Sequence, residues 1–389
     1  MSVLKWLSSR LFAHQPRSRV RRDSSFRPGL EALEDRSLPS TLTVTNTSDS
    51  GAGSLRNAVT NAAPGSTIVF APSLAGKTIK LTSAEIVLDK SVTIQGGGAV
   101  TISGNGAFRI FDVNDSTPTV IKVNLSGLTF TAGKNTGLGG AILNEGENLS
   151  LSGDVFVGNT AGNGGAVSNA FGSTLSVLNS TFSSNTTTSV GGGALINFGT
   201  ATIQNTTISG NHGPINGGGI NVQPGGTLTL INTTVANNTS GGLGGGISSL
   251  GKLNIFNSTI AGNQGTGGGG IATSNPNTTI QSSIVAKNKG GDLSGGAYHV
   301  NYSLIGSSVG VTFAAGSGNN ILNKDPLLGP LQNNGGPTLT MLPAANSPVI
   351  GKGANPKNLT TDQRGVPRSS IGVDIGAVQV TGRRMGAIG

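Results

Sequence analysis

The sequence predicts an all-β chain that winds into a right-handed parallel β-helix of roughly ten coils, each of about 26 residues. Three observations carry this prediction. Glycine accounts for 64 of the 389 residues, whereas only 11% of residues are charged. Columns of similar residues recur at one fixed spacing, which is typical of solenoids. Within each repeat, apolar residues alternate with polar ones, as in strands that bury one face.

The clear repeat begins near residue 139, where each unit opens with two or three glycines and then a small or aliphatic residue. The residues after the glycines are Ala141, Ala166, Ala194, Ile220, Ile247 and Ile271. Two apolar columns keep the same period: Leu151, Val177, Ile203, Leu230, Ile255 and Ile280, and Phe156, Phe182, Ile208, Val235, Ile260 and Ile284. We therefore expect each unit to form one coil that pairs with the next at about 4.8 Å.

Asparagine forms two further columns. The first is Asn179, Asn205, Asn232 and Asn257, and the second is Asn159, Asn185, Asn211, Asn238 and Asn263. Stacked asparagines can pass amide hydrogen bonds from coil to coil, and asparagine tolerates left-handed backbone at corners. We interpret both columns as structural, and the Asn-x-Ser/Thr matches at Asn205 and Asn232 as by-products of the stack rather than glycosylation signals.

The chain divides into three predicted parts: a basic leader at 1–40, the β-helix at 41–310 and a C-terminal closing region at 311–389. The leader carries eight Lys/Arg and four Asp/Glu, and its apolar runs are too short for a secretory signal. We expect it to be disordered or to serve targeting. An entry strand is expected at 41–44, and a short helix at 54–59 is expected to cover the open end of the stack.

Three segments resemble known families. The LEALEDRSLPS segment at 30–40 resembles leaders of planctomycete surface proteins, and the repeat resembles polymorphic-outer-membrane-protein and pectate-lyase-like β-helix repeats. The motifs NNGGPTLT, TDQRGVPR and DIGAVQ make roughly residues 280–380 resemble the choice-of-anchor Q domain of bacterial surface proteins. These resemblances imply an extracellular location, or one at the cell surface or outer envelope. Gly351 and Gln379 stand where that domain usually has acids, which weakens the idea of a shared acidic site.

Composition excludes several classes. The chain has no cysteine, so it forms neither disulfides nor thiolate metal sites. No apolar run approaches 18 residues, so we expect no transmembrane segment. The net charge of +9 is spread thinly, whereas nucleic-acid readers cluster basic residues. We expect no nucleic-acid partner, and polysaccharide or cell-envelope components are the partners that the sequence leaves open. The oligomeric state is not predicted.

The central coils lack the residues that catalysis needs. Between residues 155 and 286 the only charged residue is Lys252. Glycoside hydrolysis usually needs two carboxylates, and calcium sites are built largely from carboxylate and carbonyl oxygens. We therefore predict no catalytic, cofactor-binding or metal-binding residues.

Acidic residues do occur nearer the ends. Asp112, Asp115 and Asp154 are interpreted as solvated loop carboxylates, with weak metal or acid/base roles as the alternative. The coil spacing allows Asp112 and Asp154 to share a face. A second cluster consists of Asp362, Arg364, Arg368 and Asp374. It is interpreted as a set of ion pairs closing the C-terminal end, with an arginine site for an anionic sugar as the alternative.

The chain offers few histidines and aromatic residues as candidates for a binding site. His212 is expected to be an exposed corner residue, and His14 and His299 have no recognisable partners. Tyr298 and Tyr302 flank His299, as a small sugar-stacking patch or as surface loop aromatics.

The sequence as a whole favours a non-enzymatic extracellular or cell-envelope β-helix with a structural or adhesin-like role. One alternative is a carbohydrate-binding module for neutral glycans, which would use the uncharged Asn/Thr/Ser face. The other is a weak or degenerate polysaccharide lyase or hydrolase that uses the terminal carboxylates.

Overall fold

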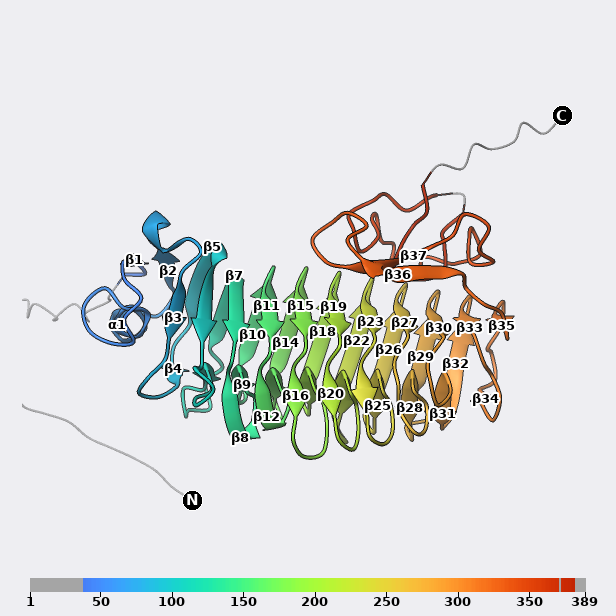
Figure 1. Ribbon diagram of the computed structural model, residues 1–389, viewed down its shortest axis with the longest axis horizontal. Coiled ribbons are helices and arrows are strands. Elements are labelled where there is room, and N and C mark those ends of the chain that lie inside the picture. The colour runs from blue at the N-terminus through green and yellow to red at the C-terminus, as the bar shows by residue number, and fades with distance from the viewer. Residues whose placement is uncertain (1–37, 371, 382–389) are drawn as a thin grey trace, which may run out of the picture. The chain divides into compact units, whose positions relative to one another are not determined.

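The computed structural model describes residues 38–370 and 372–381. Most of the predicted leader, residues 1–37, lies outside the described residues, as does His14. Within them, the backbone forms the predicted right-handed parallel β-solenoid of about ten coils of about 26 residues (Figure 1). All strand pairs of the coils are parallel, as a chain that returns to the same side once per coil requires.

The first coils confirm the predicted entry strand and helix. Strand β1 (Thr41–Val44) pairs with β2 (Ser66–Phe70). Helix α1 (Leu55–Asn61) begins after Ser54, whose hydroxyl accepts a hydrogen bond from the backbone N–H of Asn57. Leu55, Ala58 and Val59 are buried, so α1 covers the left end of the stack in Figure 1. A 3₁₀ turn, η1 (Pro72–Leu74), and strands β3 (Thr78–Lys80) and β5 (Val92–Ser103) complete this end.

Each regular coil contributes strands to up to four ladders, which we name here. The long-strand ladder contains β7 (Lys122–Thr131), β10 (Asn148–Ser152), β14 (Thr174–Leu178), β18 (Thr200–Gln204), β22 (Thr227–Ile231), β26 (Lys252–Phe256), β29 (Thr278–Gln281), β32 (Ala297–Asn301) and β34 (Thr312–Phe313). The short-strand ladder contains the last part of β7, then β11 (Val155–Val157), β15 (Thr181–Ser183), β19 (Thr207–Ser209), β23 (Thr234–Ala236), β27 (Thr259–Ala261), β30 (Ile284–Ala286), β33 (Leu304–Ile305) and β35 (Ile321–Leu322).

Two further sheets complete the coil. The nine-stranded sheet contains β4 (Ile86–Leu88), β6 (Phe111–Val113), β9 (Ile142–Asn144), β13 (Val167–Asn169), β17 (Leu195–Asn197), β21 (Ile220–Val222), β25 (Ile247–Ser249), β28 (Ile271–Thr273) and β31 (Leu293–Gly295). The five-stranded sheet contains β8 (Lys134–Leu138), β12 (Thr160–Asn163), β16 (Thr186–Thr187), β20 (His212–Gly213) and β24 (Thr239–Ser240).

The predicted apolar columns are the register partners of neighbouring coils. Leu151 pairs with Val177, and Val177 pairs with Ile203. These side chains are at most 1% exposed, so they form the inner wall of one continuous core. The rings of Phe130, Phe156 and Phe182 stack inside it, with centroids 4.7 and 4.5 Å apart.

The two asparagine columns have different roles: one forms left-handed corners and the other forms the ladder of amide hydrogen bonds. The first column takes the left-handed backbone at the corner between the long and short strands, with φ of 45–51° at its four members. The second column is fully buried and forms the amide ladder. Its Nδ2 to Oδ1 distances are 2.9 Å for Asn159–Asn185, 3.0 Å for Asn185–Asn211, 2.8 Å for Asn211–Asn238 and 2.9 Å for Asn238–Asn263. The ladder continues through Asn288 and ends on the carboxylate of Asp292.

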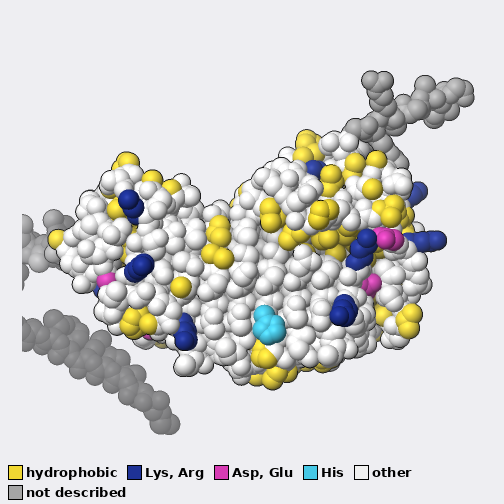
Figure 2. Space-filling model, in the orientation of Figure 1, with side chains coloured by type: hydrophobic (Ala, Val, Ile, Leu, Met, Phe, Trp, Pro, Cys, Tyr) yellow, Lys and Arg dark blue, Asp and Glu magenta, His cyan; other side chains and the backbone are white. Residues whose placement is uncertain are grey.

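The coils continue beyond the predicted boundary at residue 310, because β34 and β35 still pair with the preceding coil. The chain then turns back as the C-terminal layer (residues 324–370 and 372–380), which contains the antiparallel pair β36 (Leu328–Gln332) and β37 (Thr340–Pro343). This layer lies along the flank of the short-strand ladder rather than across the end of the stack (Figure 1 and Figure 2). Val349, Ile350 and Ile375 of the layer pack with Ile284, Ala286 and Leu304 of the ladder.

Candidate functional site

The outer surface of the long strands is a regular polar surface that runs along the described coils. Strand alternation turns every second residue outward. From β10 to β32 these outward residues are Asn148, Ser150, Ser152, Thr174, Ser176, Leu178, Thr200, Thr202, Gln204, Thr227, Thr229, Ile231, Lys252, Asn254, Phe256, Thr279, Gln281, Ala297, His299 and Asn301. We call them the long-strand face. Hydroxyl and amide groups dominate it, and it contains no carboxylate.

A polar hollow lies toward the C-terminal end of the long-strand face. It is lined by Lys252, Asn254, Asn277, Thr279 and His299. Asn254, Thr279 and His299 are register partners on three successive coils. Lys252 lies one outward position before Asn254 on β26, so the hollow spans two neighbouring columns of the face.

The lysine and the histidine at this hollow are exposed and lack acidic partners. Lys252 and His299 are both exposed, and none of the ion pairs among the described residues involves Lys252. Farther along β26, the Nζ of Lys357 from the C-terminal layer lies 4.3 Å from the ring centroid of Phe256. The layer therefore adds a second cation at the edge of the face.

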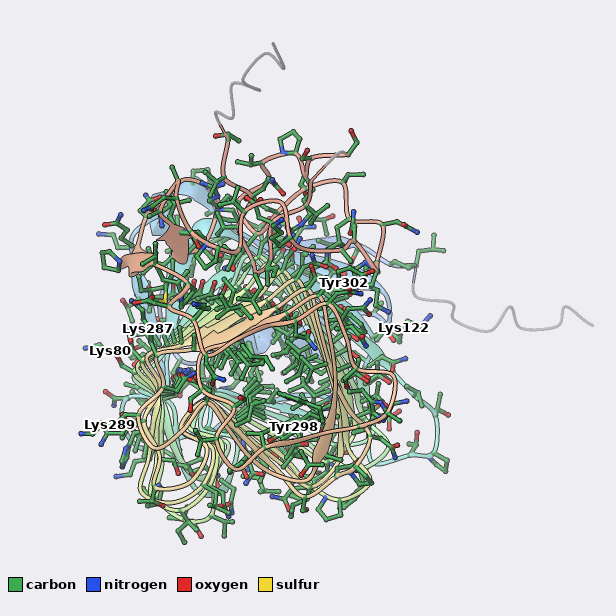
Figure 3. All side chains as sticks on the ribbon, turned by 90° about the vertical axis from the view of Figure 1, so that its right-hand side faces the viewer. Lys80, Lys122, Lys287, Lys289, Tyr298 and Tyr302 are labelled. Carbon is green, nitrogen blue, oxygen red and sulfur yellow. The ribbon has the colours of Figure 1, made fainter. Side chains whose placement is uncertain are left out.

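The predicted tyrosine patch beside His299 is wrong for Tyr298. The side chain of Tyr298 points into the core (Figure 3). That of His299 points out, because neighbouring residues of a strand alternate. Tyr298 is 0% exposed and its hydroxyl donates to the carbonyl of Ser294 at 2.6 Å. Burial raises the pKa of Tyr298 above its usual value. Tyr302 is 38% exposed at the next corner and has no tyrosine partner on the face.

A cluster of ionisable groups lies near the N-terminal end of the nine-stranded sheet. The Nη1 of Arg109 lies 3.2 Å from Oε2 of Glu85 and 3.4 Å from Oδ2 of Asp112. Burial raises the pKa of Asp112 to about 6, against the lowering effect of Arg109, and the charges of Glu145 and Glu85 add to the rise. The Oδ1 atom of Asp112 is buried without a hydrogen-bond partner. A hollow lined in part by Glu85, Arg109 and Lys134 adjoins the cluster.

The expectation that Asp112 and Asp154 share a face is wrong. Asp112 belongs to β6 of the nine-stranded sheet, whereas Asp154 occupies the corner between β10 and β11. The Asp154 carboxylate is fully buried and accepts hydrogen bonds from the N–H groups of Leu128 (2.8 Å) and Ser152 (3.0 Å). Burial raises its pKa to about 7. Asp154 is therefore a corner residue and not the solvated carboxylate that the sequence suggested.

His212 is exposed, as expected, whereas Asp115 lies in a loop, as expected, but is half-buried. Asp115 accepts hydrogen bonds from the N–H and hydroxyl of Thr117, both at 2.8 Å, and so stabilises its own loop. His212 lies in the short strand β20 of the five-stranded sheet rather than in a corner. It shares neither the hollow nor the ladder of His299, so the two histidines form no joint site.

The C-terminal cluster holds the layer against the coils. Asp362 pairs with Arg364 at 2.8 Å, and its other contacts include the N–H of Gln379 at 2.8 Å. Arg368 donates to the side-chain oxygen of Asn232 at 2.6 Å, and burial lowers its pKa to about 10. Asp374 accepts from the N–H of Gly351 at 2.7 Å. Of the predicted set of ion pairs, only the one between Asp362 and Arg364 is present among the described residues. The cluster is structural, but it lies on the flank and not at the C-terminal end, and the bond from Arg368 to Asn232 joins it to the coils.

Sequence reasoning missed Glu85, Arg109 and Glu145 as neighbours of Asp112. The one available signal was the separation of 27 residues between Glu85 and Asp112, which is about one coil. Within the described residues, no group of three or more His, Asp or Glu is placed to hold a metal ion. The helices described there include none long and apolar enough to cross a membrane.

Comparison with known proteins gives a likeness to solved structures. No protein-family model matches the chain, and no curated protein matches it. Among solved structures it is similar to the one titled "Crystal structure of pectate lyase Pel9A", with 15% sequence identity and a TM-score of 0.46. That likeness covers 89% of this chain and 98% of the other. The fold assignment therefore stands on the strand pairing of this chain itself.

Proposed function

We propose that this chain is a non-enzymatic β-helix of the cell exterior or envelope, a rigid structural or adhesin-like module that contacts polysaccharide along its long-strand face. One observation carries the proposal. The outward residues of β10 to β32 are mainly hydroxyl and amide side chains, and none of them is acidic.

The chemistry of this face suits sugar hydroxyl groups. Serine, threonine, asparagine and glutamine side chains each donate and accept hydrogen bonds, as sugar hydroxyls do. Successive coils repeat the same group at about 4.8 Å. A polysaccharide lying parallel to the solenoid axis would meet a similar group on each coil. Many weak contacts along one chain then combine into useful avidity.

The stack also suits a passive, rigid role. The asparagine ladder and the apolar columns connect every coil between β11 and β30 to both of its neighbours. The resemblance of residues 30–40 to surface-protein leaders supports an exterior location. Fractionating cells into medium, envelope and cytosol tests that location, and a soluble cytosolic pool would contradict it.

Binding is tested by affinity electrophoresis of the full chain in gels that contain neutral glucans, mannans or dextran. Thr202→Glu places a large charged side chain in the middle of the long-strand face. Thr186→Glu is the matched control, because Thr186 has similar partial exposure on the five-stranded sheet. We expect retardation of the wild type and of Thr186→Glu, and weaker retardation of Thr202→Glu. Failure of every polymer to retard the wild type would sink the proposal.

A weak hydrolase or lyase is the second candidate, favoured by one observation. Glu85 and Asp112 share the guanidinium of Arg109, and the pKa of Asp112 is raised to about 6, which suits a general acid. Reducing-end and unsaturated-uronide assays with Asp112→Asn and Glu85→Gln test it. Activity in the wild type that both substitutions abolish would replace the non-enzymatic proposal.

A further inference from the structure

We propose that the hollow between Lys252 and His299 binds an oxyanion substituent, a carboxylate or a sulfate, on the polysaccharide that lies along the long-strand face. This inference rests on the proposed function and narrows its ligand. The polymer would be sparsely acidic, with its anionic group placed over β26 and β29.

The first support is the charge of the hollow. Lys252 interrupts a column of threonines, because its register partners on the preceding coils are Thr227, Thr200 and Thr174. No ion pair among the described residues engages Lys252, whereas Lys287 pairs with Asp325 at 3.1 Å. An exposed ammonium without a protein counter-ion, on a face without carboxylates, attracts an external anion.

The second support is the arrangement of donors around that charge. Asn254, Thr279 and His299 follow one another on adjacent coils, and Asn277 lies beside them. Three coils span roughly 10 Å along the axis, which gives room for one substituted sugar and its neighbours. The amide, hydroxyl and imidazole groups can hydrogen-bond the substituent and the ring hydroxyls while the ammonium of Lys252 balances the charge.

The third support is a second cation, from the C-terminal layer, which lies over the same coil. Lys357 lies over the ring of Phe256, two outward positions beyond Lys252 on β26. Asn254 therefore lies between two cationic groups. The positive potential over β26 draws an anionic group toward this coil, whereas the outward residues of β10 to β22 supply uncharged contacts to the rest of the polymer.

The test compares three polymers that share one backbone: dextran, lightly carboxymethylated dextran and lightly sulfated dextran. Dissociation constants are measured for the full chain by affinity electrophoresis. We expect one or both acidic polymers to bind more tightly than dextran, and the two acidic arms show whether carboxylate or sulfate is preferred. Lys252→Gln should reduce that preference about two- to fivefold, the range expected for one exposed charged contact. His299→Gln should reduce it by less, because it changes a hydrogen-bonding group and not the ammonium. The preference is the ratio of the dissociation constant of dextran to that of the acidic polymer, so a loss of contacts to uncharged sugar alone does not change it.

Lys289→Gln is the matched control, because it removes the same charge from an exposed lysine on a different face of the stack (Figure 3). An equal loss of preference in Lys289→Gln would assign the effect to overall charge and overturn the site. Equal binding of all three polymers would overturn the inference and leave the proposed function standing. Absence of binding to these polymers and to every neutral glycan would remove the proposed function, and the inference with it.

Discussion

Replacing Asn211 with alanine should break the buried amide ladder in the middle of the stack. The Nδ2 of Asn211 donates to the carbonyl of Phe182 (3.1 Å) and to Oδ1 of Asn238 (2.8 Å). Its Oδ1 accepts from the backbone N–H (2.9 Å) and the Nδ2 (3.0 Å) of Asn185. Asn211 is 1% exposed, so water does not replace these partners without disturbing the coil.

The magnitude follows from the groups that lose their partner. Asn211→Ala leaves the Phe182 carbonyl and both the N–H and the amide of Asn185 without the bonds they make to this side chain, whereas Asn238 Oδ1 still accepts from the backbone N–H of residue 211. Each buried polar group without a partner costs about 1–3 kcal/mol. The amide of Asn185 keeps its bond to the Phe156 carbonyl, so the cost comes from two groups, and we expect the free energy of unfolding to fall by about 2–6 kcal/mol. The control Asn148→Ala removes an asparagine of the long-strand face and should change it by less than about 0.5 kcal/mol.

Denaturant unfolding measures the total loss, and amide hydrogen exchange shows where it falls. Because each coil of a solenoid contacts only its neighbours, the increase in exchange should centre on the coils of β15, β19 and β23. A result for Asn211→Ala within 0.5 kcal/mol of Asn148→Ala would refute the claim that the asparagine ladder stabilises the stack.

Three further predictions concern the corners, the acidic cluster and the layer. Gly192→Ala should destabilise the chain more than Gly146→Ala. Both glycines have positive φ (76° and 85°), but only at Gly192 would the added Cβ lie 2.3 Å from a carbonyl oxygen. The free energies of unfolding of the two variants should differ by about 1–3 kcal/mol. Asp112 has a pKa raised to about 6 in the folded chain, so its contribution to the free energy of unfolding is fully present below pH about 4 and is lost as the pH rises through 6. The unfolding midpoint of the wild type should therefore fall across that range, and Asp112→Asn should make this fall smaller. The same pH dependence in both proteins would contradict the raised pKa. Gln363→Ala should release the C-terminal layer to limited proteolysis while the coils stay folded, because the buried Gln363 amide bonds Thr207, whereas exposed Gln332→Ala should not.

The periodic part of the fold was predictable because each coil repeats the same physical problem. The inward columns of Leu151 and Phe156 and the asparagine columns have one period, and the pairing of one coil with the next follows from it. The sequence does not show which of the two columns forms the amide ladder, because both consist of asparagine. The backbone decides it: φ is 50° at Asn179, while Asn185 is buried and aimed at the coils on either side.

The candidate sites were less predictable because they depend on phase and on contacts distant in sequence. Tyr298 and His299 are adjacent, and only the phase of the strand decides which of them is buried. The flank position of the C-terminal layer depends on contacts such as Arg368 to Asn232, 136 residues apart, which no local pattern encodes. The N-terminal coils depart from the regular repeat, since the single strand β5 pairs with β2, β3 and β7. Counting one coil from Glu85 to Asp112 therefore suggests that they are near each other but does not give their register, which pairs Val87 with Asp112.

Hydroxyl-radical footprinting in the presence of carboxymethylated dextran tests most directly whether the long-strand face contacts polysaccharide. His299 and Phe256 report on that face, whereas exposed His212 and Phe171, which is 66% exposed, report on other surfaces. The account predicts that the polymer slows oxidation of His299 and Phe256 and leaves His212 and Phe171 unchanged. Equal protection of all four residues, or protection of His212 and Phe171 alone, would contradict it.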